Sequence, residues 1–432
     1  MIYLNIIYFL IITYYGYTFL KSRGKVVTSP FDRQQSLLLN GPEMFWVLTF
    51  ATGLLAFSAP LPVDLMAVRL LVIMILCFVG FGIVREAPVW TFPLKLYIVY
   101  LVWLLAGCFY SPSFSFGLRV VLKYCYPLIF CLFASAAVNN FPTAVKAGIA
   151  ARWVALLTII LSFSGLEALF LHGVIWYSTA RAINYISIMV FSLALFYFTD
   201  EKKKNLWFTV IFLFPCFFWV FRTSIMGSLV AIMAFAFIKW RIKSVPVIMG
   251  IIIMGIIAVF TIPSLKNKMF YQSSQNITIE DFQQGKINRK NINTNARDAM
   301  WEDLENKFYV PHKAIGSGTG TVQYYMYTHK VFGGLRVPHS DFVQMKCDNG
   351  LIGLILYCGI SILIFLHCFK IYWSTDDNRL KLFAITAGAS MLGVFVTLYS
   401  DNSVNYSMAT LAMPYGFYGM VLGLRRAAEP QG

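Results

Sequence analysis

Charged residues are scarce in this sequence. Asp, Glu, Lys and Arg together make up 12% of the 432 residues, whereas about a quarter of the residues in soluble domains are charged. Hydrophobic residues account for 59% of the chain, and its mean hydropathy is +0.68. This composition excludes an ordinary soluble enzyme and predicts that most of the surface contacts a lipid bilayer.

Acidic residues are fewer than basic ones, with 19 Asp and Glu against 35 Lys and Arg and a net charge of +16. An excess of positive charge is also typical of proteins that bind nucleic acid. Here, however, most of the basic residues lie in short segments between apolar runs, where they orient membrane helices. We therefore expect no nucleic-acid partner.

The sequence also lacks paired metal-ligating residues. Its eight cysteines are scattered, most of them inside or at the edge of apolar runs, and no two form a Cys-x-x-Cys pair. This distribution predicts neither a disulfide nor a zinc site. An Asp-x-Asp motif that would hold a divalent cation is also absent. We expect neither a metal nor another cofactor.

Long apolar runs recur from one end of the chain to the other. Runs of about 17 to 25 residues cross a hydrocarbon core of about 30 Å as helices, and these runs lack the two-residue alternation of barrel strands. The sequence therefore predicts an all-α polytopic integral membrane protein with about thirteen transmembrane helices, within a range of about twelve to fourteen. The expected spans are 2–20, 43–59, 65–84, 92–110, 118–138, 147–171, 183–199, 205–221, 223–238, 245–262, 350–369, 383–399 and 404–424.

Basic clusters between the runs predict the orientation. With the first cluster, at 21–33, in the cytoplasm, the later clusters fall on the same side, which places the N-terminus outside and the C-terminus inside. The chain then divides into an N-terminal bundle of about ten helices at 1–262, a long loop domain outside the cytoplasm at 263–349, and about three helices with a short cytoplasmic tail at 350–432. The sequence has no internal repeat, which weighs against a transporter built from inverted repeats.

Five basic residues depart from this orienting pattern because they fall near the predicted outer ends of helices: Arg69, Arg119, Lys123, Arg181 and Arg222. A charge in the membrane costs up to about 3 kcal/mol unless it is paired or hydrated, so each suggests a function. Guanidinium groups grip phosphate oxygens with two parallel hydrogen bonds, which favours a phosphate-bearing polyanion as the partner.

The structural alternative is that these side chains reach lipid head groups or pair with a nearby acid. The acids in question are Asp64, Glu167 and Asp401. The pair of Asp64 and Arg69, five residues apart, lies about one helical turn apart and fits this alternative best.

Three patterns stand out within the long loop. Arg297 precedes Trp301 by four residues in a helix-like stretch at 295–308, and a glycine-rich run occupies 316–320. The glycine run lacks the Lys of a phosphate-binding loop, so it is more typical of a turn. His339 stands among polar residues just before a predicted helix, where a neutral imidazole accepts a proton from a hydroxyl group near pH 7. His312 and His329 are alternatives that spacing does not exclude.

Taken together, these patterns resemble the O-antigen ligase and Wzy-type polymerase superfamily. The resemblance covers about 181–353 and includes the arginines, Arg297-x-x-x-Trp301, the glycine turn, and His339-Ser340-x-x-x-Gln344 followed by an acidic residue. It implies a GT-C-like, metal-independent membrane glycosyltransferase in the bacterial inner membrane, with its site facing the periplasm. The implied donor is an undecaprenyl-pyrophosphate-linked oligosaccharide.

The resemblance also implies roles for individual residues. Arg222 and Arg297 match arginines that hold the donor pyrophosphate, and His339 matches the histidine that activates the acceptor hydroxyl. Arg181 resembles another family arginine, although the usual Gly and Asn-Pro around it are absent, and Asp348 stands where a glutamate is common. The residues expected to bind substrate are Arg119, Lys123, Arg181, Ser340 and Asp348.

The expected activity is polymerisation of lipid-linked repeat units, for which a chain-length regulator protein is an expected partner. The alternative within the superfamily is an O-antigen ligase that transfers the glycan to a lipid A core; the predicted helix count and outside N-terminus differ from the twelve-helix ligase arrangement. Two rivals remain open: a flippase for the same lipid-linked unit, and a sugar transferase that depends on the Asp64 carboxylate.

Overall fold

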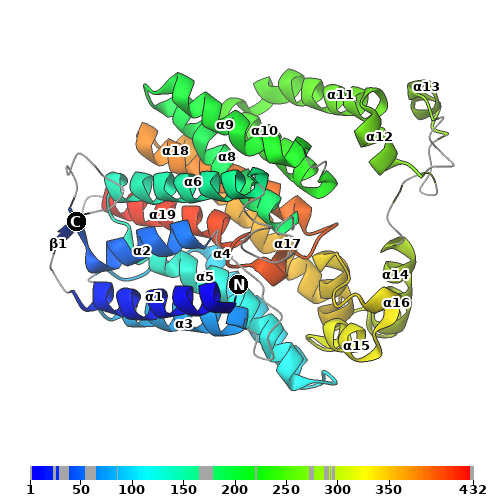
Figure 1. Ribbon diagram of the computed structural model, residues 1–432, viewed down its shortest axis with the longest axis horizontal. Coiled ribbons are helices and arrows are strands. Elements are labelled where there is room, and N and C mark those ends of the chain that lie inside the picture. Colours follow the sequence, from blue (N-terminus) through cyan, green and yellow to red (C-terminus); the bar gives the residue numbers. More distant parts are fainter. Residues whose placement is uncertain are drawn as a thin grey trace.

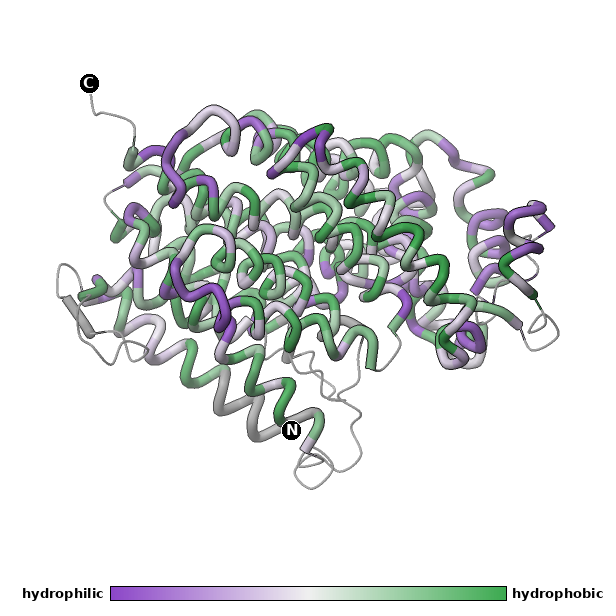
Figure 2. The backbone as a smooth tube through the Cα atoms, turned by 90° about the horizontal axis from the view of Figure 1, so that it is seen from above, coloured by the Kyte–Doolittle hydropathy of each residue, from purple (hydrophilic) through white to green (hydrophobic). Residues whose placement is uncertain are grey.

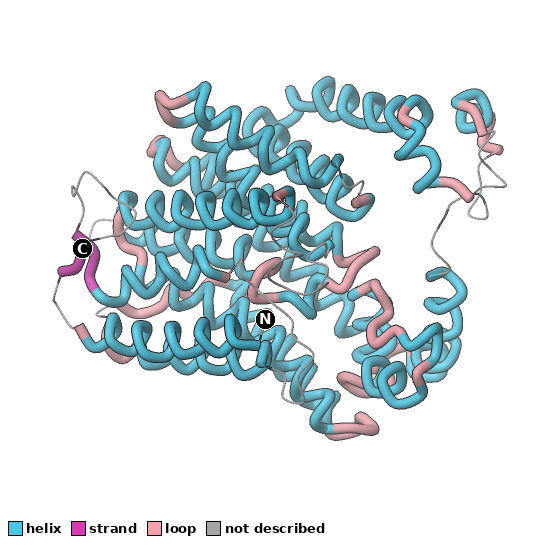
Figure 3. Tube along the Cα trace, in the orientation of Figure 1, coloured by secondary structure: helices cyan, strands magenta, loops and turns pink. Residues whose placement is uncertain are grey.

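The computed structural model describes residues 2–22, 26–28, 38–53, 65–84, 86–164, 179–218, 221–271, 277–286, 291, 293 and 297–428. Helices make up most of this part of the chain, and a short antiparallel pair of strands, β1 (Val26–Thr28) and β2 (Leu38–Asn40), joins them. Figure 3 shows the two strands at one end of the helical bundle. The prediction of a helical membrane protein is confirmed, with this hairpin as the exception.

The first half of the chain forms most of the bundle (Figure 1). Its helices are α1 (Ile2–Lys21), α2 (Gly41–Thr52), α3 (Leu65–Phe81), α4 (Phe92–Cys108), α5 (Phe114–Ala137), α6 (Phe141–Phe163), α8 (Thr179–Phe198), α9 (Lys202–Phe218), α10 (Arg222–Trp240) and α11 (Val245–Thr261).

The second half begins with short elements and ends with long helices. The short elements are α12 (Pro263–Met269), α13 (Ile279–Gln283), α14 (Arg297–Leu304), a π-helical turn η4 (Glu305–Tyr309), α15 (Thr321–His329) and α16 (Val331–Gly334). The remaining elements are α17 (Asp341–Ser374), α18 (Asn378–Thr397), the 3-10 turn η6 (Ser403–Tyr406) and α19 (Ala412–Ala428).

Within the described residues, five helical segments are long and apolar enough to cross a membrane: 114–137, 141–160, 222–261, 341–374 and 378–397. Three shorter apolar helices cover 68–81, 92–108 and 182–198. The chain is thus a multi-pass helical membrane protein, whereas the count of thirteen spans stays a prediction.

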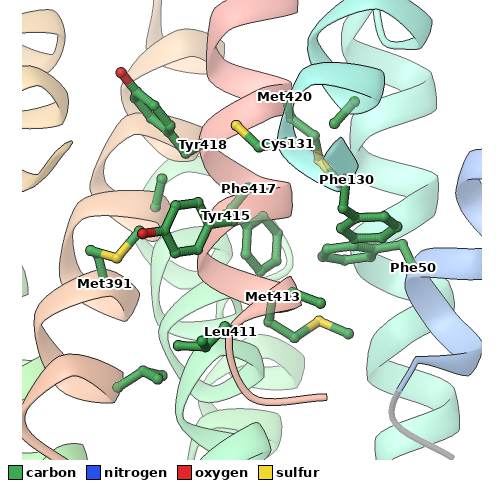
Figure 4. Packing of buried hydrophobic residues seen from close by; sticks show 14 of the residues in the cluster. Phe50, Phe130, Cys131, Met391, Leu411, Met413, Tyr415, Phe417, Tyr418 and Met420 are labelled. Carbon is green, nitrogen blue, oxygen red and sulfur yellow. The ribbon is translucent and has the colours of Figure 1, made fainter. Parts of the chain in front are cut away.

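Helix α19 lies in the middle of the core. All of its residues from Ala412 to Leu424 are buried. The ring of Phe417 packs edge-on against Phe50 of α2, whose ring in turn stacks with Phe130 of α5 (Figure 4). A Cβ atom at Gly419 would lie 2.3 Å from the carbonyl oxygen of Cys131 in α5. Small residues of this kind allow two helix backbones to approach closely in a membrane.

Several helix boundaries differ from the predicted ones. Helix α17 runs from Asp341, but Gly350 (φ 67°, ψ −170°) breaks it, so the apolar helix expected to begin at 350 does begin there. The polar part before it, at 341–349, is not predicted as a helix from hydropathy, because its polar side chains are buried against other elements rather than exposed to water. The span expected at 404–424 is divided into η6, a turn and α19. Helix α6 ends at Phe163, before the end predicted at 171. Hydropathy alone does not detect these differences, since it ignores what covers a polar side chain.

The elements between α13 and α17 form a polar end of the molecule. In Figure 2, hydrophilic segments gather at the end of the bundle opposite the strands. There α14 and α15 pack against the first turns of α17 through a small hydrophobic cluster: Met300, Trp301, Leu304, Val322, Met326, Val343 and Cys347. The helix predicted at 295–308 is confirmed by α14 and η4 within its described residues.

Candidate active site

The turn at 398–402, between α18 and η6, joins distant parts of the chain. The backbone N–H of Asp341 donates to the carbonyl oxygens of Leu398 (2.8 Å) and Asp401 (3.1 Å). The Asp341 carboxylate in turn accepts a hydrogen bond from the N–H of Val404 (3.0 Å). These bonds fix the start of α17 to the turn and place the residue pair His339 and Asp401 side by side.

The imidazole of His339 faces the carboxylate of Asp401. Nδ1 of His339 lies 4.0 Å from Oδ1 of Asp401, and the His339 side chain is 31% exposed against 7% for Asp401. At this distance the two groups are in ion-pair contact rather than hydrogen-bonded. The histidine is thus partly exposed to solvent and borders a buried acid.

Arg297 approaches the same turn from α14. Its guanidinium donates to the carbonyl oxygen of Ser400 (2.8 Å). Burial lowers the pKa of Arg297, and the nearby Asp401 carboxylate opposes this change. An arginine stays protonated under these conditions, so it brings a positive charge next to the histidine and its acid.

Arg222 reaches the site from the first turn of α10. Its guanidinium donates to the backbone carbonyl oxygens of Lys268 (3.0 Å) and Asn293. The hydroxyl of the next residue, Thr223, shares a hydrogen bond with the hydroxyl of Ser400 (2.9 Å). Carbonyl acceptors hold a guanidinium in place without cancelling its charge, so Arg222 and Arg297 form a positively charged edge of the site.

Lys123 connects α5 to the segment that follows the turn. Its Nζ donates to Oδ1 of Asn405 (2.6 Å), which also accepts from Nε2 of Gln323 in α15 (3.0 Å). Arg119, one helical turn earlier, is exposed and lies over the ring of Phe116 (5.2 Å). Lys123 therefore lies at the border of the site, whereas Arg119 lies farther out on the same helix.

Asp348 joins the glycine turn to α17. Fully buried, it accepts hydrogen bonds from the N–H groups of Gly320 (3.0 Å) and Val322 (2.9 Å) at the start of α15. Gly316 and Gly320 both have positive φ, and their φ angles of 76° and 84° are ones that residues with a side chain rarely adopt. The turn predicted from the glycines is confirmed, and the hydrogen bonds of Asp348 hold α15 in place.

Ser340 caps α17, since its side chain accepts from the N–H of Val343 (3.2 Å). Both Ser340 and Asp348 thus organise the backbone next to the site, and their predicted contacts with substrate stay predictions. Arg181 belongs to the first turn of α8, but its side chain lies outside the described part of the structure. Asp64 and Glu167 also lie outside the described residues.

The two alternative histidines lie elsewhere in the loop region. His329 ends α15, where its Nδ1 pairs with the hydroxyl of Thr328 (2.9 Å) and the carbonyl oxygen of Tyr325 (3.1 Å). His312 ends an exposed 3-10 turn at 310–312. Of the three histidines, His339 is the one that the structure brings to the turn at 398–402, which Arg297 also contacts.

The sequence patterns do not predict that the turn at 398–402 is part of the site. The sequence indicates Asp401 only as an acid that pairs with an arginine, and it places Asn405 inside the predicted span at 404–424. The signal that was available is the run Asp401-Asn-Ser-Val-Asn405, a polar cluster between two apolar runs. An acid at such a position is expensive in a membrane unless it has a function or a partner.

In the described part of the chain, no three His, Cys, Asp or Glu residues are grouped closely enough to hold a metal ion. Metal independence stays a prediction. The arrangement instead provides two guanidinium groups for an anion and an imidazole with a buried carboxylate for proton transfer.

Fold and site together define a multi-pass helical membrane protein with an arginine-rich polar site at one end. Residues 207–358 match the family model of the O-antigen ligase domain. This match supports the assignment to the O-antigen polymerase and ligase superfamily that the sequence patterns indicate. The matched segment includes Arg222, Arg297 and His339 and ends before the 398–402 turn. No curated protein matches the chain.

Proposed function

We propose that this protein polymerises undecaprenyl-pyrophosphate-linked repeat units into O-antigen or a related surface polysaccharide. The reaction takes place at the periplasmic face of the bacterial inner membrane. One observation carries the proposal: three separate segments meet at the turn at 398–402, which Arg297 and His339 contact directly and the segment of Arg222 contacts through the neighbouring Thr223. The match of residues 207–358 to the O-antigen ligase model supports the glycan substrate class.

In this proposal a sugar hydroxyl of the acceptor attacks the anomeric carbon of the donor. The bond from that carbon to the pyrophosphate oxygen breaks as the new glycosidic bond forms, and the anomeric centre inverts. Nε2 of His339 takes the hydroxyl proton, which contributes about 10²- to 10⁴-fold to the rate. Arg222 and Arg297 stabilise the departing lipid pyrophosphate, an effect often worth several kcal/mol in a site that excludes water.

Asp401 completes the proposed machinery. Its carboxylate faces Nδ1 of His339 (4.0 Å) and favours the protonated imidazole that forms during the reaction. Lys123, Asn405 and the exposed Arg119 extend the polar region toward α5, where we place the acceptor glycan. Arg181, Ser340 and Asp348 complete the proposed set of substrate-binding residues.

The proposed topology has about thirteen spans, with the loop domain at 263–349 in the periplasm. The position of α14 to α16 at the opposite end of the bundle from β1 and β2 supports it (Figure 1). A single added cysteine at exposed Gln283 is expected to react with a membrane-impermeant maleimide in intact spheroplasts, and one at exposed Lys203 only after lysis. Labelling of both cysteines in intact spheroplasts contradicts this topology.

A ligase is the second candidate, because the matched family model describes an O-antigen ligase. Lipopolysaccharide from a strain that lacks the protein separates the two activities. A core capped by a single repeat unit indicates a polymerase, and an unsubstituted core with accumulating lipid-linked polymer indicates a ligase. Normal long chains in the deletion strain contradict both.

A further inference from the structure

Trp301 lies one helical turn after Arg297 in α14, and the proposed function gives it no role. Its side chain is 8% exposed and belongs to the small cluster that packs α14 against α17. The indole N–H donates to the carbonyl oxygen of Pro338 (2.7 Å). Because Pro338 directly precedes His339, the carbonyl group that Trp301 holds belongs to the peptide bond leading into the histidine.

His339 has a left-handed backbone conformation, which is uncommon for residues other than glycine. Its φ is 53°, in the left-handed region where side chains other than glycine are strained. The direction of the Pro338 carbonyl is set by the same peptide plane that determines φ of His339. A hydrogen bond to this carbonyl therefore resists a flip of the plane and keeps the imidazole on the side of Asp401.

The residues that flank His339 are held from both directions. On one side is the bond from Trp301; on the other, Ser340 caps α17 and the N–H of Asp341 is tied to the 398–402 turn. The ring of Trp301 also packs edge-on against that of Tyr399 in the same turn, with centroids 5.9 Å apart. Trp301 thus touches both segments whose relative position determines the distance from His339 to Asp401.

We propose that Trp301 is a positioning residue for His339, acting through the hydrogen bond of its indole to the Pro338 carbonyl. This inference rests on the proposed function, in which His339 accepts the proton. Arg297, in the same short helix, donates a hydrogen bond to the carbonyl oxygen of Ser400. The position of His339 relative to Asp401 therefore depends on the packing of α14 against α17 and the 398–402 turn.

The test compares Trp301→Phe, which removes the N–H and keeps an aromatic ring, with Trp373→Phe. Trp373 donates a similar bond to the carbonyl oxygen of Ile238 (2.9 Å), but it lies near the far end of α17. The assay is glycan lengthening by purified protein in liposomes, with lipid-linked oligosaccharide extracted from a strain lacking the protein. We expect Trp301→Phe to lower turnover about 10-fold without changing KM for this donor, because misalignment removes part of the contribution of the base.

A second arm uses the His339→Ala background. If Trp301 acts through His339, adding Trp301→Phe to His339→Ala lowers the residual turnover no further. Trp301→His, whose ring also carries an N–H, is expected to recover part of the turnover lost in Trp301→Phe. Thermal midpoints of the purified variants identify any variant that fails to fold. If Trp301→Phe is one of them, the test rests on the turnover of Trp301→His compared with that of His339→Ala.

Three results overturn the inference while the proposed function stands. The first is equal turnover by Trp301→Phe and Trp373→Phe. The second is an equal loss of turnover from Trp301→Phe in the presence and absence of His339, and the third is turnover by Trp301→His no higher than that of Trp301→Phe. Wild-type turnover by His339→Ala is a different failure, because it removes the proton acceptor from the proposed function and with it the reason for positioning that residue.

Discussion

Nδ1 of His339 lies 4.0 Å from Oδ1 of Asp401, although the two residues are far apart in the sequence. The carboxylate is buried and the imidazole is partly exposed, which is the arrangement that the proposed mechanism requires of a base and the acid beside it. The turn that carries Asp401 also contacts the elements that bear Arg222 and Arg297.

Substitution of the orienting acid is expected to impair turnover. Asp401→Asn keeps the size of the side chain but loses the charge that favours the protonated imidazole, so we expect about a 10- to 100-fold loss, part of the contribution of a general base. Glycan lengthening in isolated membranes at matched expression measures this effect. Asp376→Asn, at a fully exposed position, is the control, and equal turnover of the two variants contradicts a role for Asp401.

The two site arginines are expected to be needed for leaving-group stabilisation. Arg222→Ala and Arg297→Ala should each lower turnover about 10²- to 10³-fold, the cost of removing one preorganised donor for a developing charge. Lysine at either position keeps the positive charge but is not a bidentate hydrogen-bond donor, so it should recover only part of the turnover lost in the alanine variant.

The control for these variants is Arg336→Ala, because Arg336 is an exposed arginine of the loop region that lies over the ring of Tyr327 (5.4 Å). We expect its turnover to stay near that of the wild type. A loss as large as that of Arg297→Ala would mean that the general charge of the loop, and not the two site arginines, determines activity.

The glycine turn is expected to be a determinant of stability. Gly318 has a φ of 104°, and a Cβ atom there would lie 2.6 Å from Cα of Ser111, so Gly318→Ala requires the backbone to move. Gly333 also has a positive φ, of 71°, but nothing lies within 4 Å of its added Cβ. Gly333→Ala should cost about 1 to 2 kcal/mol from the conformation alone, and Gly318→Ala considerably more. Thermal unfolding in detergent compares them, and equal midpoints contradict the close packing of this turn.

Metal removal is expected to leave turnover unchanged, because the proposed mechanism assigns the stabilisation of the pyrophosphate to guanidinium groups. Turnover by purified protein in excess EDTA, compared with added Mg²⁺ or Mn²⁺, measures this. If EDTA lowers turnover at least 10-fold and either cation restores it, a divalent cation stabilises the pyrophosphate together with Arg222 and Arg297.

The sequence was sufficient for features that depend on local pattern. Long apolar runs predicted membrane helices, Arg297-Asp-Ala-Met-Trp301 lay in a predicted helix, and the glycine run predicted a turn, all of which the structure confirms. The proximity of Arg222, Arg297 and His339 was expected from the family resemblance rather than from spacing.

Features that depend on tertiary contacts were not predictable in the same way. The polar start of α17 reads as a loop because Asp341, Gln344 and Asp348 lower its hydropathy, but each is buried and hydrogen-bonded to another segment or within the helix. The partnership of His339 with Asp401 depends on a turn between two helices, and no sequence spacing encodes that contact. The strained backbone of His339 likewise follows from bonds on both sides of it.

The central claim is that this site transfers glycosyl units, and reconstitution tests it most directly. Purified wild-type protein and His339→Ala are placed in liposomes that contain the extracted lipid-linked repeat unit, and glycan length is measured by mass spectrometry. Our account predicts longer lipid-linked glycans with the wild type and little or no lengthening with His339→Ala. Movement of the lipid-linked unit across the bilayer without any lengthening, equally by both proteins, would contradict it and favour a transporter.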